Sequence, residues 1–196
     1  MAREIEIKLE IPAAAASKVM RLPWLWEQAS GEVQPASMSA TYYDTPKRLL
    51  RKKGVTLRVR RAGNKHVQTV KTAPNGNGSP LAGSEWETEV LSGAPEFKRA
   101  VSAPLKEFSR RKLRRALKPV FEVKVERSAY PVQSANSAIE VAIDRGQIAA
   151  DGSSLEFCEI ELELKRGASS ELARIGRRLA AEVPASLGFK TKADRG

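Results

Sequence analysis

Glu4-Ile5-Glu6-Ile7-Lys8-Leu9-Glu10-Ile11, close to the N-terminus, is the stretch that decides the fold class of this chain. Its charged residues fall on one face and its apolar residues on the other, with the period of two that is typical of a β-strand. Seven later segments also have strand character: 37–43, 55–61, 66–72, 85–90, 120–130, 139–149 and 155–164. Their hairpin-like spacing predicts an α+β fold built on an antiparallel sheet or barrel.

Helix-forming composition lies between some of these strands, at 13–21, 47–53, 95–118 and 170–182. No internal repeat and no low-complexity linker divides the 196 residues. We therefore expect one domain that spans residues 1–196.

The chain carries 34 Lys and Arg against 23 Asp and Glu, so its formal net charge is +11. This balance favours a partner rich in negative charge, and nucleic acid, an anionic membrane surface and a polyphosphorylated small molecule all qualify. One Cys and one His exclude a disulfide framework, a Cys-based zinc site and a multi-His metal site, so carboxylates would have to bind any metal. The sequence has no apolar run of about 20 residues and no apolar signal core, so we expect a cytoplasmic protein that does not cross a membrane.

The charged faces of the strands are the main indication of function. Such a face ordinarily lies in solvent, but Glu159, Glu161 and Glu163 repeat at every second residue, where like charges repel. A hard cation such as Mg²⁺ or Mn²⁺ would neutralise this triplet, and Arg58 and Arg60 on another strand would bind phosphate. A closed barrel with this lining would be a charged tunnel, with its apolar face turned outward and partly covered by helices.

Glu4-Ile5-Glu6-Ile7-Lys8 resembles the E-x-E-x-K signature of the CYTH superfamily, also called triphosphate tunnel metalloenzymes. Further matches follow in family order through nearly the whole chain: Tyr42-Tyr43-Asp44-Thr45, Leu57-Arg58-Val59-Arg60, Thr69-Val70-Lys71, Glu85-Trp86-Glu87, Arg127, Glu140, Asp144-Arg145-Gly146, Glu159 to Leu164, and Thr191 to Gly196 with Thr in place of the family's Ser. The resemblance implies an eight-stranded antiparallel β-barrel that forms a tunnel, with helices packed outside it. It also implies a metal-dependent triphosphatase, most similar to the bacterial inorganic triphosphatases that act on tripolyphosphate. Many of these carry a C-terminal CHAD domain, and this chain ends before one, either as a short protein or as part of a longer one.

The residues and the resemblance together suggest a role for each charged position. The residues expected to bind the triphosphate are Lys8, Arg58, Arg60, Lys71, Arg127, Lys192 and Arg195. The residues expected to hold one or two Mg²⁺ or Mn²⁺ ions are Glu4, Glu6, Asp144, Glu159, Glu161 and Glu163. The expected catalytic residues are Glu4, Glu6 and Lys8, with Lys8 stabilising or protonating the leaving group. The residues expected to support the tunnel are Glu85, Glu87, Glu122, Lys124 and Glu140.

One strand gives two conflicting predictions. Alternation from Glu122 places Lys124 and Glu126 in the tunnel, whereas the resemblance favours Arg127. Both predictions hold only if a β-bulge intervenes. We favour Arg127 as the residue of this strand that lines the tunnel, with Lys124 as the second choice.

Several alternative functions remain open. The same tunnel could cyclise ATP, or hydrolyse thiamine triphosphate or nucleoside triphosphates. A non-catalytic module for RNA or long polyphosphate is the alternative from a different class, because the basic stretch 106–118 could contact phosphates. We favour a solvated helix face for that stretch, and a dimer is left open.

Overall fold

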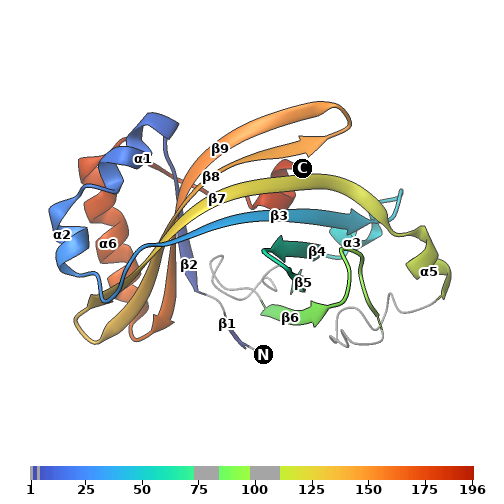
Figure 1. Ribbon diagram of the computed structural model, residues 1–196, viewed down its shortest axis with the longest axis horizontal. Coiled ribbons are helices and arrows are strands. Elements are labelled where there is room, and N and C mark those ends of the chain that lie inside the picture. The colour runs from blue at the N-terminus through green and yellow to red at the C-terminus, as the bar shows by residue number, and fades with distance from the viewer. Residues whose placement is uncertain (1, 4, 73–83, 98–110) are drawn as a thin grey trace.

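An antiparallel sheet dominates the computed structural model, which describes residues 2–3, 5–72, 84–97 and 111–196 (Figure 1). In this part of the chain the strands are β1 (Ala2–Arg3), β2 (Glu6–Glu10), β3 (Gln34–Asp44), β4 (Val55–Ala62), β5 (Lys65–Thr72), β6 (Ser84–Val90), β7 (Lys118–Ser134), β8 (Ser137–Ala150), β9 (Ser153–Arg166) and β10 (Ser186–Leu187). Their order in the sheet is β1-β6-β5-β4-β3-β7-β8-β9-β2-β10. Each of the eight predicted segments lies on one of the longer strands, β2 to β9, which confirms the predicted α+β class.

The N-terminal segment joins the two ends of this sheet. Ala2 and Arg3 pair with β6, whereas Glu6–Glu10 pairs with β9 and continues to β10. Consecutive parts of one segment thus lie at opposite ends of the strand order, so the sheet must curl until its ends meet. The described ladder is not continuous between β1 and β2, and the sheet is therefore a nearly closed tunnel rather than a strictly closed barrel.

Three helices cover the outer face of one half of the sheet: α1 (Ala13–Val19), α2 (Pro23–Glu27) and α6 (Ser169–Glu182) (Figure 1). Ile160 and Leu162 of β9 are fully buried there, in one cluster with Leu172 and Ile175 of α6. The charged residues of the same strands point the other way, because side chains alternate along a strand. This confirms the predicted arrangement, in which the apolar face is turned outward and lies under helices.

Three short helices complete the described elements: α3 (Leu49–Lys52), α5 (Arg111–Ala116) and α7 (Lys192–Arg195). Asp44, at the end of β3, stabilises the start of α3, because its carboxylate accepts the backbone N–H groups of Leu50 at 2.9 Å and Arg51 at 3.0 Å. Residues 98–110 of the predicted helix 95–118, and with them Lys106 and Arg110 of the basic stretch, lie outside the described residues. No described helix has the length and apolar character needed to span a membrane.

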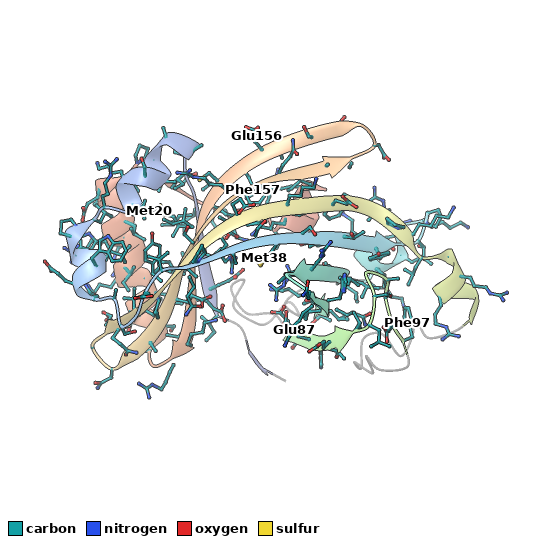
Figure 2. All side chains as sticks on the ribbon, viewed as in Figure 1. Met20, Met38, Glu87, Phe97, Glu156 and Phe157 are labelled. Atoms are coloured by element: carbon teal, nitrogen blue, oxygen red, sulfur yellow. The ribbon has the colours of Figure 1, made fainter. Side chains whose placement is uncertain are left out.

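The C-terminal helix α7 was not predicted, and it lies on the concave side of the sheet, where Figure 1 marks the C-terminus. Ala193 packs there against a cluster that includes Phe121 and Val123 of β7 and Phe157 of β9. Figure 2 labels Met38 and Phe157, two members of this apolar patch. The patch continues along the same concave face that carries the charged residues.

Strand β7 corrects one expectation about the tunnel lining. Phe121, Val123 and Val125 are buried, whereas Glu122 and Lys124 are exposed. The register between β7 and β8 runs without a shift from Glu122–Ala149 to Ser134–Ser137, so the proposed bulge does not occur there. Glu122 and Lys124 therefore face away from the tunnel, and their assignment as its supports is wrong. The prediction failed because it took the charged face of this strand as the inner one, although the inner face here is apolar and packs against α7.

Candidate active site

The concave face of the sheet encloses a cavity of about 510 Å³. Eight of the charged residues predicted from the sequence line it, and they come from strands on both sides of the curled sheet and from α7. The predicted residues in the lining are Glu6, Lys8, Arg58, Arg60, Lys71, Arg127, Glu161 and Lys192. The cavity thus brings together predicted positions that are up to 186 residues apart in sequence, from Glu6 to Lys192.

Three carboxylates cluster at one side of this cavity, and we call Asp144, Glu159 and Glu161 the acidic trio; Glu161 lines the cavity, and Asp144 and Glu159 lie buried beside it. Asp144 on β8 is the register partner of Glu159 on β9, and Glu161 follows two residues later on the same face. One oxygen from each lies within 4.8 Å of the others. Asp144 and Glu159 are completely buried, and buried carboxylates at this spacing require cations to neutralise them.

Lys192 supplies one of these cations from α7. Its Nζ lies 2.9 Å from Asp144 Oδ2, 2.6 Å from Glu159 Oε1 and 2.8 Å from Glu161 Oε1. Burial opposes the charge of Lys192, but Glu161 and Asp144 outweigh it and raise the pKa of the ammonium above its usual range. Burial likewise opposes the charge of Glu161, but Lys192 and Lys8 hold the pKa of this carboxyl well below its usual range.

Arg127 and Lys8 add further positive charge around the trio. The Nε and Nη2 atoms of Arg127 donate to the two oxygens of Asp144 at 2.7 and 2.8 Å, and Nη2 also donates to Glu161. Burial opposes the charge of Arg127, but the hydrogen bonds to Asp144 and the charge of Glu161 raise the pKa of its guanidinium. The Nζ of Lys8 lies 3.4 Å from Glu161 Oε1. Of the two residues that sequence analysis left for β7, the structure brings Arg127 to the site and leaves Lys124 outside it.

The opposite wall of the cavity carries a second group of cations on β4 and β5. Arg58 and Lys71 share one carboxylate, with Arg58 Nη2 3.6 Å from Glu85 Oε1 and Lys71 Nζ 3.1 Å from Glu85 Oε2. Arg60 donates to Glu87 Oε1 at 3.1 Å, and Figure 2 labels Glu87. Burial and the neighbouring charge of Arg58 lower the pKa of Arg60. Burial and Arg58 thus outweigh the compensation that Glu87 gives to Arg60, and an anion bound beside Arg60 would stabilise its charge.

The remaining predicted residues lie apart from the trio. Glu163 and Glu140 both pair with Lys165, at 2.7 and 3.5 Å, so the third glutamate of the triplet does not join the other two. Glu6 lines the cavity without belonging to the trio, and Glu4 lies outside the described residues.

Arg195 is placed differently from its predicted role in binding substrate. Its Nη2 lies 2.8 Å from Glu10 Oε1 and 3.1 Å from Glu159 Oε2. Arg195 is not one of the described residues that line the cavity. Arg195 thus attaches α7 to β2 and to the rear of the acidic trio.

Arg48 and Arg51 also line the cavity, although the sequence pattern did not indicate them. In a strand, alternation shows which way each side chain points. These residues belong to the turn and short helix after β3, where side chains do not alternate between two faces. The backbone of Arg48 is left-handed, with φ of 53°, so even a helical periodicity would not have indicated its direction.

The acidic trio fits a divalent metal ion by its chemistry. Among the described residues, neither oxygen of buried Glu159 accepts a well-aligned hydrogen bond. Its contacts to Lys192 and Arg195, at 2.6 and 3.1 Å, are therefore ionic contacts without that alignment. Oxygen ligands of this kind suit Mg²⁺ and Mn²⁺, so the residues present are compatible with either ion.

Comparisons with known proteins agree with this geometry. The CYTH domain family model matches residues 2–196. An inorganic triphosphatase of Haemophilus influenzae is 29% identical over 198 aligned positions, which cover 100% of this chain and 54% of that protein. The chain therefore spans about half the length of this curated relative.

Solved structures share the fold at low sequence identity. A proposed adenylate cyclase of Bacillus halodurans superposes with a TM-score of 0.63 at 17% identity, covering 100% of this chain and 98% of the other. A proposed adenylyl cyclase of Hippeastrum, described as having a dominant triphosphatase activity, gives a TM-score of 0.59 at 20% identity, with 98% and 95% covered. At these identities the two structures establish the fold of the chain and nothing more.

Proposed function

The chain belongs to the CYTH domain family, and from this premise we propose that it hydrolyses a triphosphate, most readily inorganic tripolyphosphate, in the cavity on the concave face of its sheet. One observation carries the proposal: a single cavity is lined by Glu161 of the acidic trio on one side and by the cations Arg58, Arg60 and Lys71 on the other. The inorganic triphosphatase of Haemophilus influenzae supports the choice of substrate.

The cations position the polyanionic substrate in this account. Arg58, Arg60 and Arg127 offer planar guanidinium groups that can grip phosphoryl oxygens with two hydrogen bonds, whereas Lys8 and Lys71 act as point charges. Phosphoryl transfer depends mainly on positioning and on stabilising charge that develops on oxygen, so a cation-lined cavity is the main requirement.

The acidic trio would hold Mg²⁺ or Mn²⁺, which supplies Lewis-acid stabilisation to the phosphoryl oxygens when it is bound. A carboxylate of the lining, with Glu6 as the first choice, orients a water molecule toward the terminal phosphorus and accepts a proton from it. The bond between that phosphorus and the bridging oxygen breaks, and the products are phosphate and pyrophosphate. Lys8 donates a hydrogen bond to the leaving pyrophosphate oxygen and stabilises its charge.

Phosphate release from tripolyphosphate tests this function. We expect release by the purified chain with Mg²⁺ or Mn²⁺ and none after chelation. Glu161→Gln should reduce the rate by about 100-fold or more, because it removes a carboxylate from the centre of the site. The matched control is Glu126→Gln, which makes the same change on the exposed face of β7 and should leave the rate within twofold. Absence of release with every divalent ion, or full activity of Glu161→Gln, contradicts the proposal.

A nucleoside triphosphate is the second candidate substrate because of one aromatic residue. Phe189 lines the cavity and is 80% exposed, so a base could stack on it. The same assay with ATP in place of tripolyphosphate separates the candidates: faster release from ATP reverses the order of preference.

A further inference from the structure

We infer that the ammonium of Lys192 occupies the place of the divalent ion, and that metal enters the acidic trio by displacing Lys192 together with α7. This inference rests on the metal site of the proposed function and adds an order of events to it. Lys192 would thus change partners, from the carboxylates in the metal-free protein to a solvent-facing or phosphate-facing position once metal is bound.

The contacts of Lys192 are those expected of an internal counter-ion. Its Nζ is within 2.9 Å of all three members of the trio, so it lies at the point where their oxygens converge. No other cation among the described residues pairs with all three carboxylates. Arg127 pairs with Asp144 and Glu161, Lys8 with Glu159 and Glu161, and Arg195 with Glu159.

The charge at this point leaves no place for an additional ion. Three carboxylates meet four cations: Lys8, Arg127, Lys192 and Arg195. A divalent ion added to this set would be repelled by the cations at a few ångströms, and the buried site offers little screening. One cation therefore has to leave before the ion can bind.

Lys192 is the cation that can leave with least disturbance of the fold. Lys8 and Arg127 project from β2 and β7, which are paired on both sides within the sheet. Lys192 projects from α7, which has only four residues, and a helix of that length has little stability of its own. The capping box of Thr191 and Asp194 orders the helix internally, and the packing of Ala193 on the concave apolar patch and the ion pair of Arg195 with Glu10 hold it against the sheet.

Arg195 acts as a positioning residue for this docked arrangement. Its ion pair with Glu10 fixes the end of α7 against β2. The centroid of the Phe157 ring lies 5.3 Å from Lys192 Nζ and 5.7 Å from the Arg195 guanidinium carbon, so one ring supports both cations. The docked helix thereby presents Lys192 to the trio from the cavity side.

The displacement has a measurable thermodynamic consequence. If the docked arrangement holds about 90–99% of the population, the apparent dissociation constant for metal is about 10- to 100-fold weaker than that of the open site. By linkage, bound metal must shift the population of α7 from the docked to the open arrangement. Metal affinity and α7 mobility are therefore coupled.

Mn²⁺ binding to the substrate-free protein, followed by electron paramagnetic resonance, tests the first half of this coupling. Lys192→Met keeps the length of the side chain and removes its charge, and it should tighten Mn²⁺ binding by about tenfold or more. Lys8→Met removes an equal charge from the neighbourhood of two of these carboxylates, Glu161 at 3.4 Å and Glu159 at 3.9 Å, without vacating the centre, and should tighten binding by no more than about threefold. Lys190→Met, a change of the same charge in the same segment, should alter it less than about twofold. Lys192→Met should also lower the rate of tripolyphosphate hydrolysis, so affinity and activity change in opposite directions.

Hydrogen exchange of peptide 188–196 in the unmodified protein tests the second half and does not depend on the variants folding. We expect addition of Mn²⁺ to accelerate exchange in this peptide and to leave the peptides of α6 unchanged. If exchange in this peptide is unaltered, or if Lys192→Met and Lys8→Met tighten Mn²⁺ binding equally, the displacement is wrong. Mn²⁺ binding itself would still support the proposed metal site. Absence of Mn²⁺ binding to the unmodified protein and to every variant overturns the metal site itself.

Discussion

Glu85 contacts two cations with one carboxylate. Of the supporting residues, we therefore expect its removal to have the largest effect on substrate binding. Its two oxygens contact Arg58 and Lys71, which face the cavity from neighbouring strands. Without this carboxylate the two cations would repel each other and lose their common position. The predicted supporting role of Glu85 and Glu87 thus agrees with their contacts, whereas Glu140 pairs with Lys165 instead.

The substitution Glu85→Gln tests this support. We expect KM for tripolyphosphate to rise by about tenfold with a smaller change in kcat, because substrate contacts are disordered while the acidic trio is intact. Glu89→Gln on the same strand is the matched control, since Glu89 is exposed and lies 3.9 Å from Lys65 at the surface. Equal effects of the two substitutions on KM would show that Glu85 has no special role.

The glutamate triplet shows what residue spacing can and cannot predict. Glu159, Glu161 and Glu163 do lie on one face of β9, as the alternation indicated. Whether they form one site depends on the neighbouring strands, which place Lys165 beside Glu163 and Asp144 beside Glu159. The spacing of residues within one strand does not specify these cross-strand neighbours.

At the scale of elements, alternation predicted the strands because each has one apolar and one charged or exposed face. Strand β7 differs from the other strands, because its inner face is apolar at Phe121 and Val123 and becomes charged only at Arg127. Helix α7 could not be predicted from periodicity, because four residues contain little more than one helical turn. Its one local signal is Thr191 followed three residues later by Asp194, which form the capping box.

Helix α6 offers a test of how the outer layer packs on the sheet. A Cβ added to Gly176 would lie 3.5 Å from Leu162 Cδ1 and 3.8 Å from Ile7 Cγ2, which are ordinary van der Waals distances. Gly176→Ala should therefore raise the free energy of unfolding by about 0.5–1 kcal/mol, because alanine restricts the unfolded chain and favours the helix. Chemical denaturation measures this change.

Gly146 on β8 provides the contrasting substitution. A Cβ at this position would lie 2.3 Å from the backbone oxygen of Lys124, so Gly146→Ala must displace the paired strand and lower stability. If Gly176→Ala is destabilising by more than about 1 kcal/mol, α6 packs closer to β2 and β9 than described.

At the scale of the whole molecule, the fold is a curled sheet with its charged face inside and much of its apolar face outside under helices. The sequence predicted this inversion, because charged faces recur on strands whose other faces are apolar. The curvature that brings Lys8, Arg127 and Lys192 around one trio arises from the pairing of segment 2–10 with both ends of the sheet. No local pattern encodes that pairing, so the cavity as a three-dimensional site had to come from the structure and the family resemblance.

Diffraction from crystals grown with Mn²⁺ and tripolyphosphate tests the proposed metal and substrate sites most directly. The anomalous signal of Mn²⁺ locates the ion independently of any assumption about its ligands. We predict a peak within coordination distance, about 2.0–2.3 Å, of oxygens from Asp144, Glu159 and Glu161, with phosphate oxygens beside Arg58 and Arg127. A Mn²⁺ peak outside the cavity, with the three carboxylates still bound to Lys192 and substrate present, would contradict the account.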